Sequence, residues 1–147
     1  MSDARTDQTT HQTPEPTPAA DSGTPTVRIV TDSSCDLPAP IADELGITIV
    51  PLSIRFGSDE FIDREELSTA EFWSRCVNSA TLPETAAPAP GQFEQAYRAA
   101  AADGATGVVV VSLSSALSAT MQSAQLAARS TDAIMAVIMR AVRAKGR

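Results

Sequence analysis

Residues 108–120 read VVVVSLSSALSAT, four consecutive valines followed by a turn that is rich in hydroxyl side chains. A continuous run of β-branched residues is typical of a parallel strand that is buried on both faces. The turn then leads into a predicted helix, from about Ala116 to Arg129. A buried strand that feeds directly into a helix indicates the repeating unit of an α/β fold.

The sequence upstream shows the same alternation of strands and helices. Its predicted elements, in chain order, are a strand over 26–31, a helix over 38–45, a strand over 47–56, a helix over 68–77 and a helix over 90–102. Pro38 suits the first turn of a helix and Gly46 its end, while Ser68 and Glu71 have the spacing of a capping box. The order predicts an α/β fold with a small parallel sheet covered by helices.

Ligands of such sheets bind beyond the carboxyl ends of the strands. Two polar loops, Asp32–Asp36 and Ser112–Ser115, are expected at that edge, and the Pro- and Ala-rich loop 81–90 crosses toward it. In the first loop, we expect Asp32 to order the loop and Asp36 to cap the next helix. Cys35 is expected to be a small buried residue, because two flanking aspartates disfavour its thiolate.

The composition describes one ordinary globular domain with flanking segments. The chain has 147 residues, of which 43% are hydrophobic and 20% charged. Its net charge of −7 opposes binding to nucleic acid or to anionic lipid, and no apolar run has the length of a membrane span. We expect a disordered arm over 1–25, a domain over 26–130 and an amphipathic helical tail over 131–147.

Few residues of this chain suit catalysis. The single histidine, His11, lies in the predicted arm, so we expect no catalytic Ser-His pair. No cysteine pair has the spacing of metal ligands either, so we expect no metal site. No glycine-rich phosphate loop is present, and two distant cysteines suggest a reducing cytoplasm. The sequence therefore predicts a cytoplasmic protein that is not an enzyme and needs no cofactor.

The hydroxyl-rich turn is the strongest candidate for a binding site. Free N–H groups at a helix N-terminus attract an anion, and serine hydroxyls add further donors. The alternative is that Ser114 or Ser115 simply caps the helix. Four serines in the turn exceed what capping needs, which favours the binding of an anion such as a carboxylate.

Three segments together resemble the DegV family of bacterial fatty-acid-binding proteins. They are VTDSSCDLP at 30–38, TAAPAPGQF at 85–93 and SLSSALSATMQSA at 112–124. Their order and spacing resemble the family over about residues 27–129. The resemblance implies a protein that holds a long-chain fatty acid, its carboxylate on hydroxyl groups and its acyl chain in an apolar tunnel.

By residue matching, the resemblance assigns the two carboxylate donors to Thr85 and Ser115, with Ser114 as a neighbouring candidate. It further implies a protein without chemistry of its own, which in some members presents the acid to a fatty acid kinase. Several positions depart from the family pattern, where alanine or methionine replaces polar, glycine or tyrosine residues: Ala86, Ala87, Ala89, Ala116, Ala119 and Met121.

The length also departs from the family. The chain resembles only the N-terminal domain, is apparently truncated, and ceases to resemble the family after about Arg129. A second domain, which supplies a His and an Arg near the ligand, has no counterpart in the sequence. An alternative expectation is therefore a fragment without lipid binding that acts at most as an interaction module.

Overall fold

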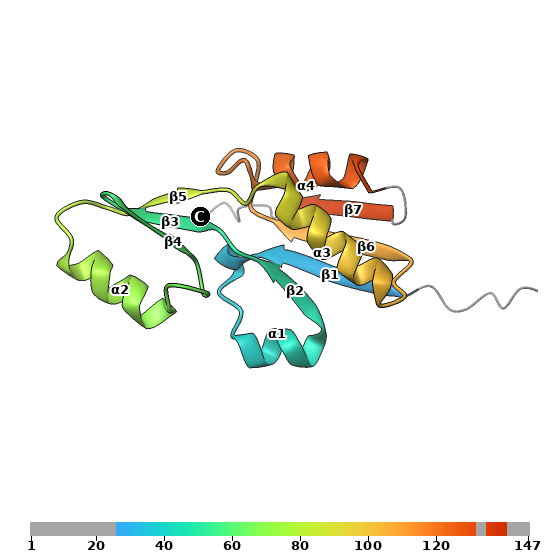
Figure 1. Ribbon diagram of the computed structural model, residues 1–147, viewed down its shortest axis with the longest axis horizontal. Coiled ribbons are helices and arrows are strands. Elements are labelled where there is room, and N and C mark those ends of the chain that lie inside the picture. The colour runs from blue at the N-terminus through green and yellow to red at the C-terminus, as the bar shows by residue number, and fades with distance from the viewer. Residues whose placement is uncertain (1–25, 132–134, 141–147) are drawn as a thin grey trace, which may run out of the picture.

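The computed structural model describes residues 26–131 and the backbone of 135–140. A four-stranded parallel sheet forms the centre of the molecule, with the strand order β2-β1-β6-β7 (Figure 1). Its strands are β1 (Val27–Asp32), β2 (Ile47–Val50), β6 (Gly107–Ser112) and β7 (Met135–Arg140). The predicted parallel sheet is thereby confirmed, whereas the arm expected over 1–25 lies outside the described residues.

Helices cover the two faces of this sheet unequally. They are α1 (Ala39–Leu45), which packs on β2, and α3 (Pro90–Ala102) and α4 (Thr120–Arg129), which pack together on the opposite face. The step from β1 to β2 runs toward one edge of the sheet. The step from β6, which lies on the other side of β1, to β7 runs toward the opposite edge. Crossovers between parallel strands are right-handed almost without exception, so this reversal places their helices on opposite faces.

The core lies between the sheet and the pair α3 and α4. It is built from small and aliphatic side chains around two aromatic rings, Phe93 and Tyr97, which are both fully buried and 6.2 Å apart between centroids. Val30, Val108 and Val110 supply the sheet side of this core. The alternation of buried and exposed residues along β1 and β6 follows from the two-residue period of a strand.

The opposite face of the sheet stays largely bare. Val27, Ile29 and Val111 are 54%, 41% and 39% exposed, respectively. The prediction that the valine run is buried on both faces is therefore wrong. Among the described residues only α1 occupies this face, and it lies beside β2 at the edge of the sheet (Figure 1).

The tail prediction is also wrong over residues 135–140. This segment forms β7 and pairs in parallel with all of β6, from Gly107 opposite Met135 to Ser112 opposite Arg140. The unpaired edge of β6 offers backbone donors and acceptors that a strand satisfies, and a β-branched pair such as Val137 and Ile138 suits a strand. The remaining residues of the expected tail, 132–134 and 141–147, lie outside the described part of the chain.

A second, antiparallel sheet with the order β4-β3-β5 was not predicted (Figure 1). It consists of β3 (Ser53–Phe56), β4 (Asp59–Ile62) and β5 (Glu84–Ala86), accompanied by α2 (Thr69–Asn78). The single strand expected over 47–56 is broken at Pro51, which has no N–H for a ladder. The predicted capping box of Ser68 and Glu71 is present at the start of α2, and Phe72 of that helix packs edge-on against Phe56 at 6.0 Å.

Tyr97 makes this core lose stability at alkaline pH. Its hydroxyl donates to the carbonyl of Ala124 at 3.1 Å, and burial raises its pKa from 10.0 to about 12. A raised pKa in the folded state means stability that is complete below pH 10.0 and is lost as pH rises toward 12.

We therefore expect the free energy of unfolding to fall between pH 10 and 12 in urea titrations. The chain has one tyrosine, so absorbance at about 295 nm follows this ionisation directly. The Tyr97→Phe variant serves as the control, because it removes the titrating group. An equal fall in the variant would contradict the assignment to Tyr97.

Candidate functional site

Asp32 joins the two polar loops at the carboxyl edge of the parallel sheet. Its carboxylate is 1% exposed and accepts from the backbone N–H of Ser34 at 3.1 Å and from the Ser34 hydroxyl. The other carboxylate oxygen accepts from the N–H of Leu113 at 3.3 Å. The expectations that both loops lie at this edge and that Asp32 orders its own loop are thus confirmed, and the bond to Leu113 shows in addition that the two loops meet.

Two expectations for the same turn are wrong. Asp36 does not cap α1, because that helix begins after Pro38 without a side-chain cap and Asp36 lies 3.7 Å from Arg64 instead. Cys35 is exposed rather than buried. The tight 3-10 turn over Ser33–Cys35 buries Ser33 and leaves the two residues after it at the surface.

Ser114 accepts the hydrogen bonds that hold the hydroxyl-rich turn together. Its carbonyl accepts from the N–H groups of Leu117 at 2.8 Å and Ser118 at 3.1 Å, while its hydroxyl accepts from Ala116 at 3.4 Å. Because this turn occupies the residues before it, α4 begins at Thr120 rather than near Ala116. Neither Ser114 nor Ser115 therefore caps α4, and the simple capping alternative is wrong.

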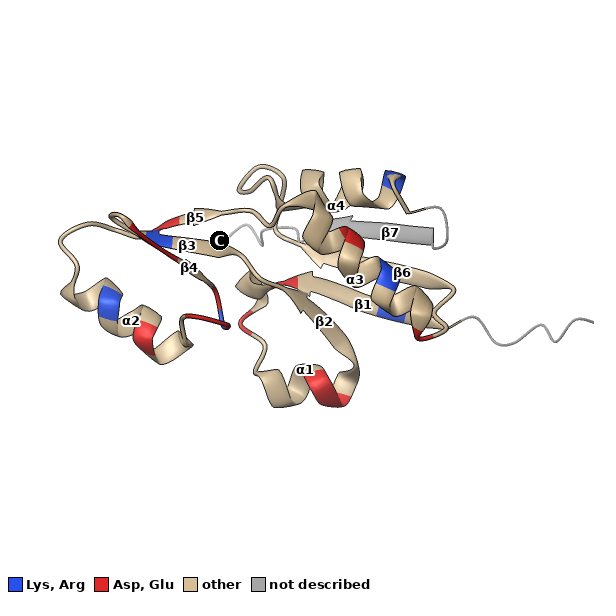
Figure 2. Ribbon diagram, viewed as in Figure 1, with Lys and Arg blue, Asp and Glu red and all other residues tan. Residues whose placement is uncertain are grey.

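Ser115 lies exposed in this turn, and among the described residues no hydrogen bond engages its hydroxyl. Figure 2 shows no charged residue in the β6–α4 loop, whereas acidic residues gather along β4 and the connection that follows it. An anion at this loop would therefore be held by hydroxyl and backbone donors rather than by a cation. Such bonds to a charged acceptor are roughly twice as strong as those between neutral groups.

Thr85 lies in the middle of β5, directly opposite Ile54 of β3. Cross-strand neighbours share one face of a sheet, so Thr85 is on the face of buried Ile54. A cavity of about 160 Å³ on this face brings Thr85 together with the apolar side chains Leu52, Ile54, Phe72 and Trp73. Thr69 and the acidic residues Asp36 and Asp63 also line this cavity. Within the described residues, no hydrogen bond engages the Thr85 side chain.

The two predicted donors thus lie in different sheet units. Thr85 belongs to the antiparallel sheet, while Ser115 follows the end of β6 in the parallel sheet. In the described part of the chain no hydrogen bond joins them. A larger cavity of about 400 Å³, beside α1 and β2, is lined by Ile47, Ile49 and Arg64 but by none of the predicted site residues.

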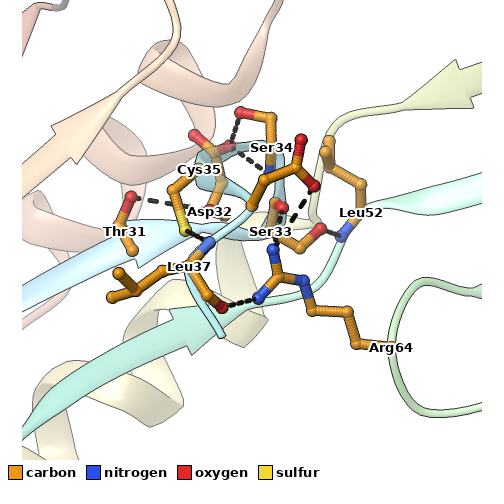
Figure 3. Close-up of polar contacts among 9 residues, drawn as sticks. Thr31, Asp32, Ser33, Ser34, Cys35, Leu37, Leu52 and Arg64 are labelled. Carbon is orange, nitrogen blue, oxygen red and sulfur yellow. Dashed lines mark hydrogen bonds and ion pairs between the residues drawn. The ribbon is translucent and has the colours of Figure 1, made fainter. Parts of the chain in front are cut away.

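Arg64 connects the two units and was missed by the sequence analysis. It follows β4, and its guanidinium donates to the carbonyls of Leu37 at 2.5 Å and Ser33 at 2.9 Å (Figure 3). The hydroxyl of Ser33 in turn accepts from the N–H of Leu52 at 3.0 Å, just before β3. In sequence, Arg64 stands in the charged run 63–66, which carries no signal of this role.

A family model described as "Uncharacterised protein, DegV family" matches residues 26–139. The chain belongs to the DegV family. The match includes nearly all of β7, so the expectation that the resemblance ends near Arg129 is wrong. A DegV domain-containing protein of Halalkalibacterium halodurans is 38% identical over 108 residues, which cover 74% of this chain and 38% of the relative.

Solved DegV structures resemble the chain in fold as well. A DegV family protein from Thermus thermophilus, described for its fatty acid binding, is 32% identical with a TM-score of 0.68. The match covers 78% of this chain and 40% of that protein. A stearic acid-binding protein from Eubacterium ventriosum is 26% identical with a TM-score of 0.68, and the match covers 78% of this chain and 41% of that one.

This DegV chain therefore spans about two-fifths of the length of the relatives it matches. Among its described helices, none is both long and apolar enough to cross a bilayer. The described residues also contain no cluster of three His, Cys, Asp or Glu side chains suited to a metal ion.

Proposed function

We propose that this DegV chain binds a long-chain fatty acid and that Thr85 and Ser115 donate to its carboxylate. Ser114 is the neighbouring candidate donor. The observation that carries the proposal is the pair of exposed hydroxyls without partners among the described residues, in a family whose solved members are described as fatty-acid-binding.

The chemistry of both positions fits this ligand. A carboxylate accepts several hydrogen bonds, and neutral hydroxyls supply them without a competing counter-charge. The cavity at Thr85 offers Leu52, Ile54, Phe72 and Trp73 as apolar surface for the first part of an acyl chain. Cavities that enclose a whole small ligand usually have a volume of about 300–1,000 Å³. The rest of the acyl chain therefore extends beyond the cavity at Thr85.

The proposed role is to bind and carry a fatty acid and not to catalyse a reaction. In line with the family resemblance, the bound carboxylate is presented to a fatty acid kinase, and the protein needs no cofactor of its own. The proposed location is the cytoplasm. The two cysteines, Cys35 and Cys76, are both free thiols, as a reducing compartment favours.

A second candidate function is an interaction module without lipid binding. The bare apolar face of the parallel sheet, with Val27, Ile29 and Val111 exposed, favours this alternative. Apolar surface of this kind often marks a contact with another protein.

The test is the double variant Thr85→Ala/Ser115→Ala, titrated with stearate. Trp73 is the single tryptophan and lines the cavity at Thr85, so its fluorescence reports occupancy. Loss of two donors to a charged group is expected to weaken stearate binding by at least about tenfold. Both side chains are exposed, so the unfolding free energy should change by less than about 0.5 kcal/mol.

The matched control is Thr48→Ala/Ser130→Ala, which removes one exposed threonine and one exposed serine away from Thr85 and Ser115. It should bind stearate as the unmodified chain does. Unchanged affinity in the Thr85→Ala/Ser115→Ala variant would refute the head-group assignment. Failure of the unmodified chain to bind stearate would refute the proposed function, and concentration-dependent association would then support the interaction module.

A further inference from the structure

Asp36 and Arg64 have the left-handed backbone conformation, which residues other than glycine seldom adopt. Their φ angles are 50° and 68°, and they are the non-glycine residues with positive φ in the described part of the chain. A non-glycine residue in this conformation is strained and persists only where its surroundings hold it. The two side chains are also partners of one another, 3.7 Å apart.

The surroundings that hold Arg64 are specific. Its backbone N–H donates to the carbonyl of Leu67 at 3.0 Å, which fixes the chain after β4. Its guanidinium, with 22% of the side chain exposed, then reaches the carbonyls of Ser33 and Leu37. The fork of an arginine can engage two acceptors at once, which a lysine ammonium does less rigidly.

This contact connects the two parts of the proposed binding site. The turn 33–37 is tied to the antiparallel sheet by Arg64 and by the N–H of Leu52, which donates to Ser33. The preceding residue, Asp32, is tied to the β6–α4 loop through the N–H of Leu113. Thr85 belongs to the antiparallel sheet at one end of this chain of bonds, and Ser115 belongs to the β6–α4 loop at its other end.

We propose that Arg64 is a positioning residue, which sets the placement of the antiparallel sheet against the parallel sheet and thereby the separation of Thr85 and Ser115. Arg64 itself needs no contact with the ligand. The effect of Arg64 on binding of the fatty-acid carboxylate rests on the proposed function. Its effect on the turn 33–37 and the β6–α4 loop does not.

The first measurement is amide hydrogen exchange without ligand, on Arg64→Gly and Arg64→Lys. Glycine adopts the left-handed backbone readily, so Arg64→Gly removes the side chain with its guanidinium and adds no backbone strain. We expect exchange at Leu52 and Leu113 to accelerate by at least about tenfold in Arg64→Gly and by less in Arg64→Lys. The control Arg98→Ala removes an exposed arginine paired with Glu94 and should leave both amides unchanged. Unchanged exchange in Arg64→Gly would overturn the inference.

The second measurement compares stearate with methyl stearate, which has the same acyl chain without the carboxylate. Misplaced donors should weaken stearate binding to Arg64→Gly by about tenfold and leave the ester unaffected. Equal loss for both ligands would reveal a merely structural role and overturn the positioning of the donors. If the unmodified chain binds neither ligand, the proposed function fails, and the exchange measurement alone decides for or against Arg64.

Discussion

Replacing Phe93 with alanine is expected to lower the free energy of unfolding by about 3–5 kcal/mol. Phe93 is 0% exposed and lies between α3 and the parallel sheet, in the same cluster as Tyr97, Val30 and Val110. Truncation removes buried apolar area and leaves a void that the surrounding helices and strands fill only in part. Urea unfolding measures this loss as a lower midpoint at a constant slope.

Gln95→Ala provides the control on the same helix. Gln95 is exposed, and alanine is a strong helix former, so the unfolding free energy should change by less than about 0.5 kcal/mol. A loss below about 1 kcal/mol in Phe93→Ala would contradict the core assignment, because no fully buried phenylalanine in a packed core is so dispensable.

Asp32→Ala is expected to cost about 2–4 kcal/mol, because it leaves two backbone N–H groups of the site without their acceptor. These groups belong to Ser34 and Leu113, one in each polar loop. Asp32→Asn keeps one acceptor oxygen and turns an amide N–H toward the other donor. The asparagine variant should therefore lose about half as much stability.

The loss should be visible both in urea unfolding and in faster exchange of the Leu113 amide. Asp36→Asn is the control in the same turn, since Asp36 has an 84% exposed side chain in a surface ion pair. Asparagine also tolerates its left-handed backbone, so a change below about 0.5 kcal/mol is expected. If Asp32→Ala and Asp36→Asn were equally stable, Asp32 would not be the residue that orders the two loops.

Local features of the sequence led to correct predictions. The helix at 39–45 follows from Pro38 and Gly46, whose φ of 62° only glycine adopts without cost, and the start of α2 follows from Ser68 and Glu71. The location of the Asp32 and Leu113 loops at one edge follows from strand order in a parallel sheet. Each of these signals lies within a few residues or within one topological rule.

Long-range pairing accounts for the errors. Residues 135–140 form a strand because the edge of β6 is open to them, although their own apolar and basic pattern also suits a helix. Val111 is exposed because no described helix lies over it, which its neighbours in the valine run could not reveal. At the break after Pro51, the N–H of Leu52 finds its acceptor in the hydroxyl of Ser33, 19 positions earlier, which the local sequence does not indicate.

The sequence by itself determined the parallel α/β architecture, the family resemblance and the candidate hydroxyls Thr85, Ser114 and Ser115. The tertiary structure alone decided that Thr85 and Ser115 lie in different sheet units and that Arg64 bridges those units. The reason is physical. Propensities and caps act between neighbours in the chain, whereas an arginine at the end of one strand acquires its role from carbonyls about 30 positions away.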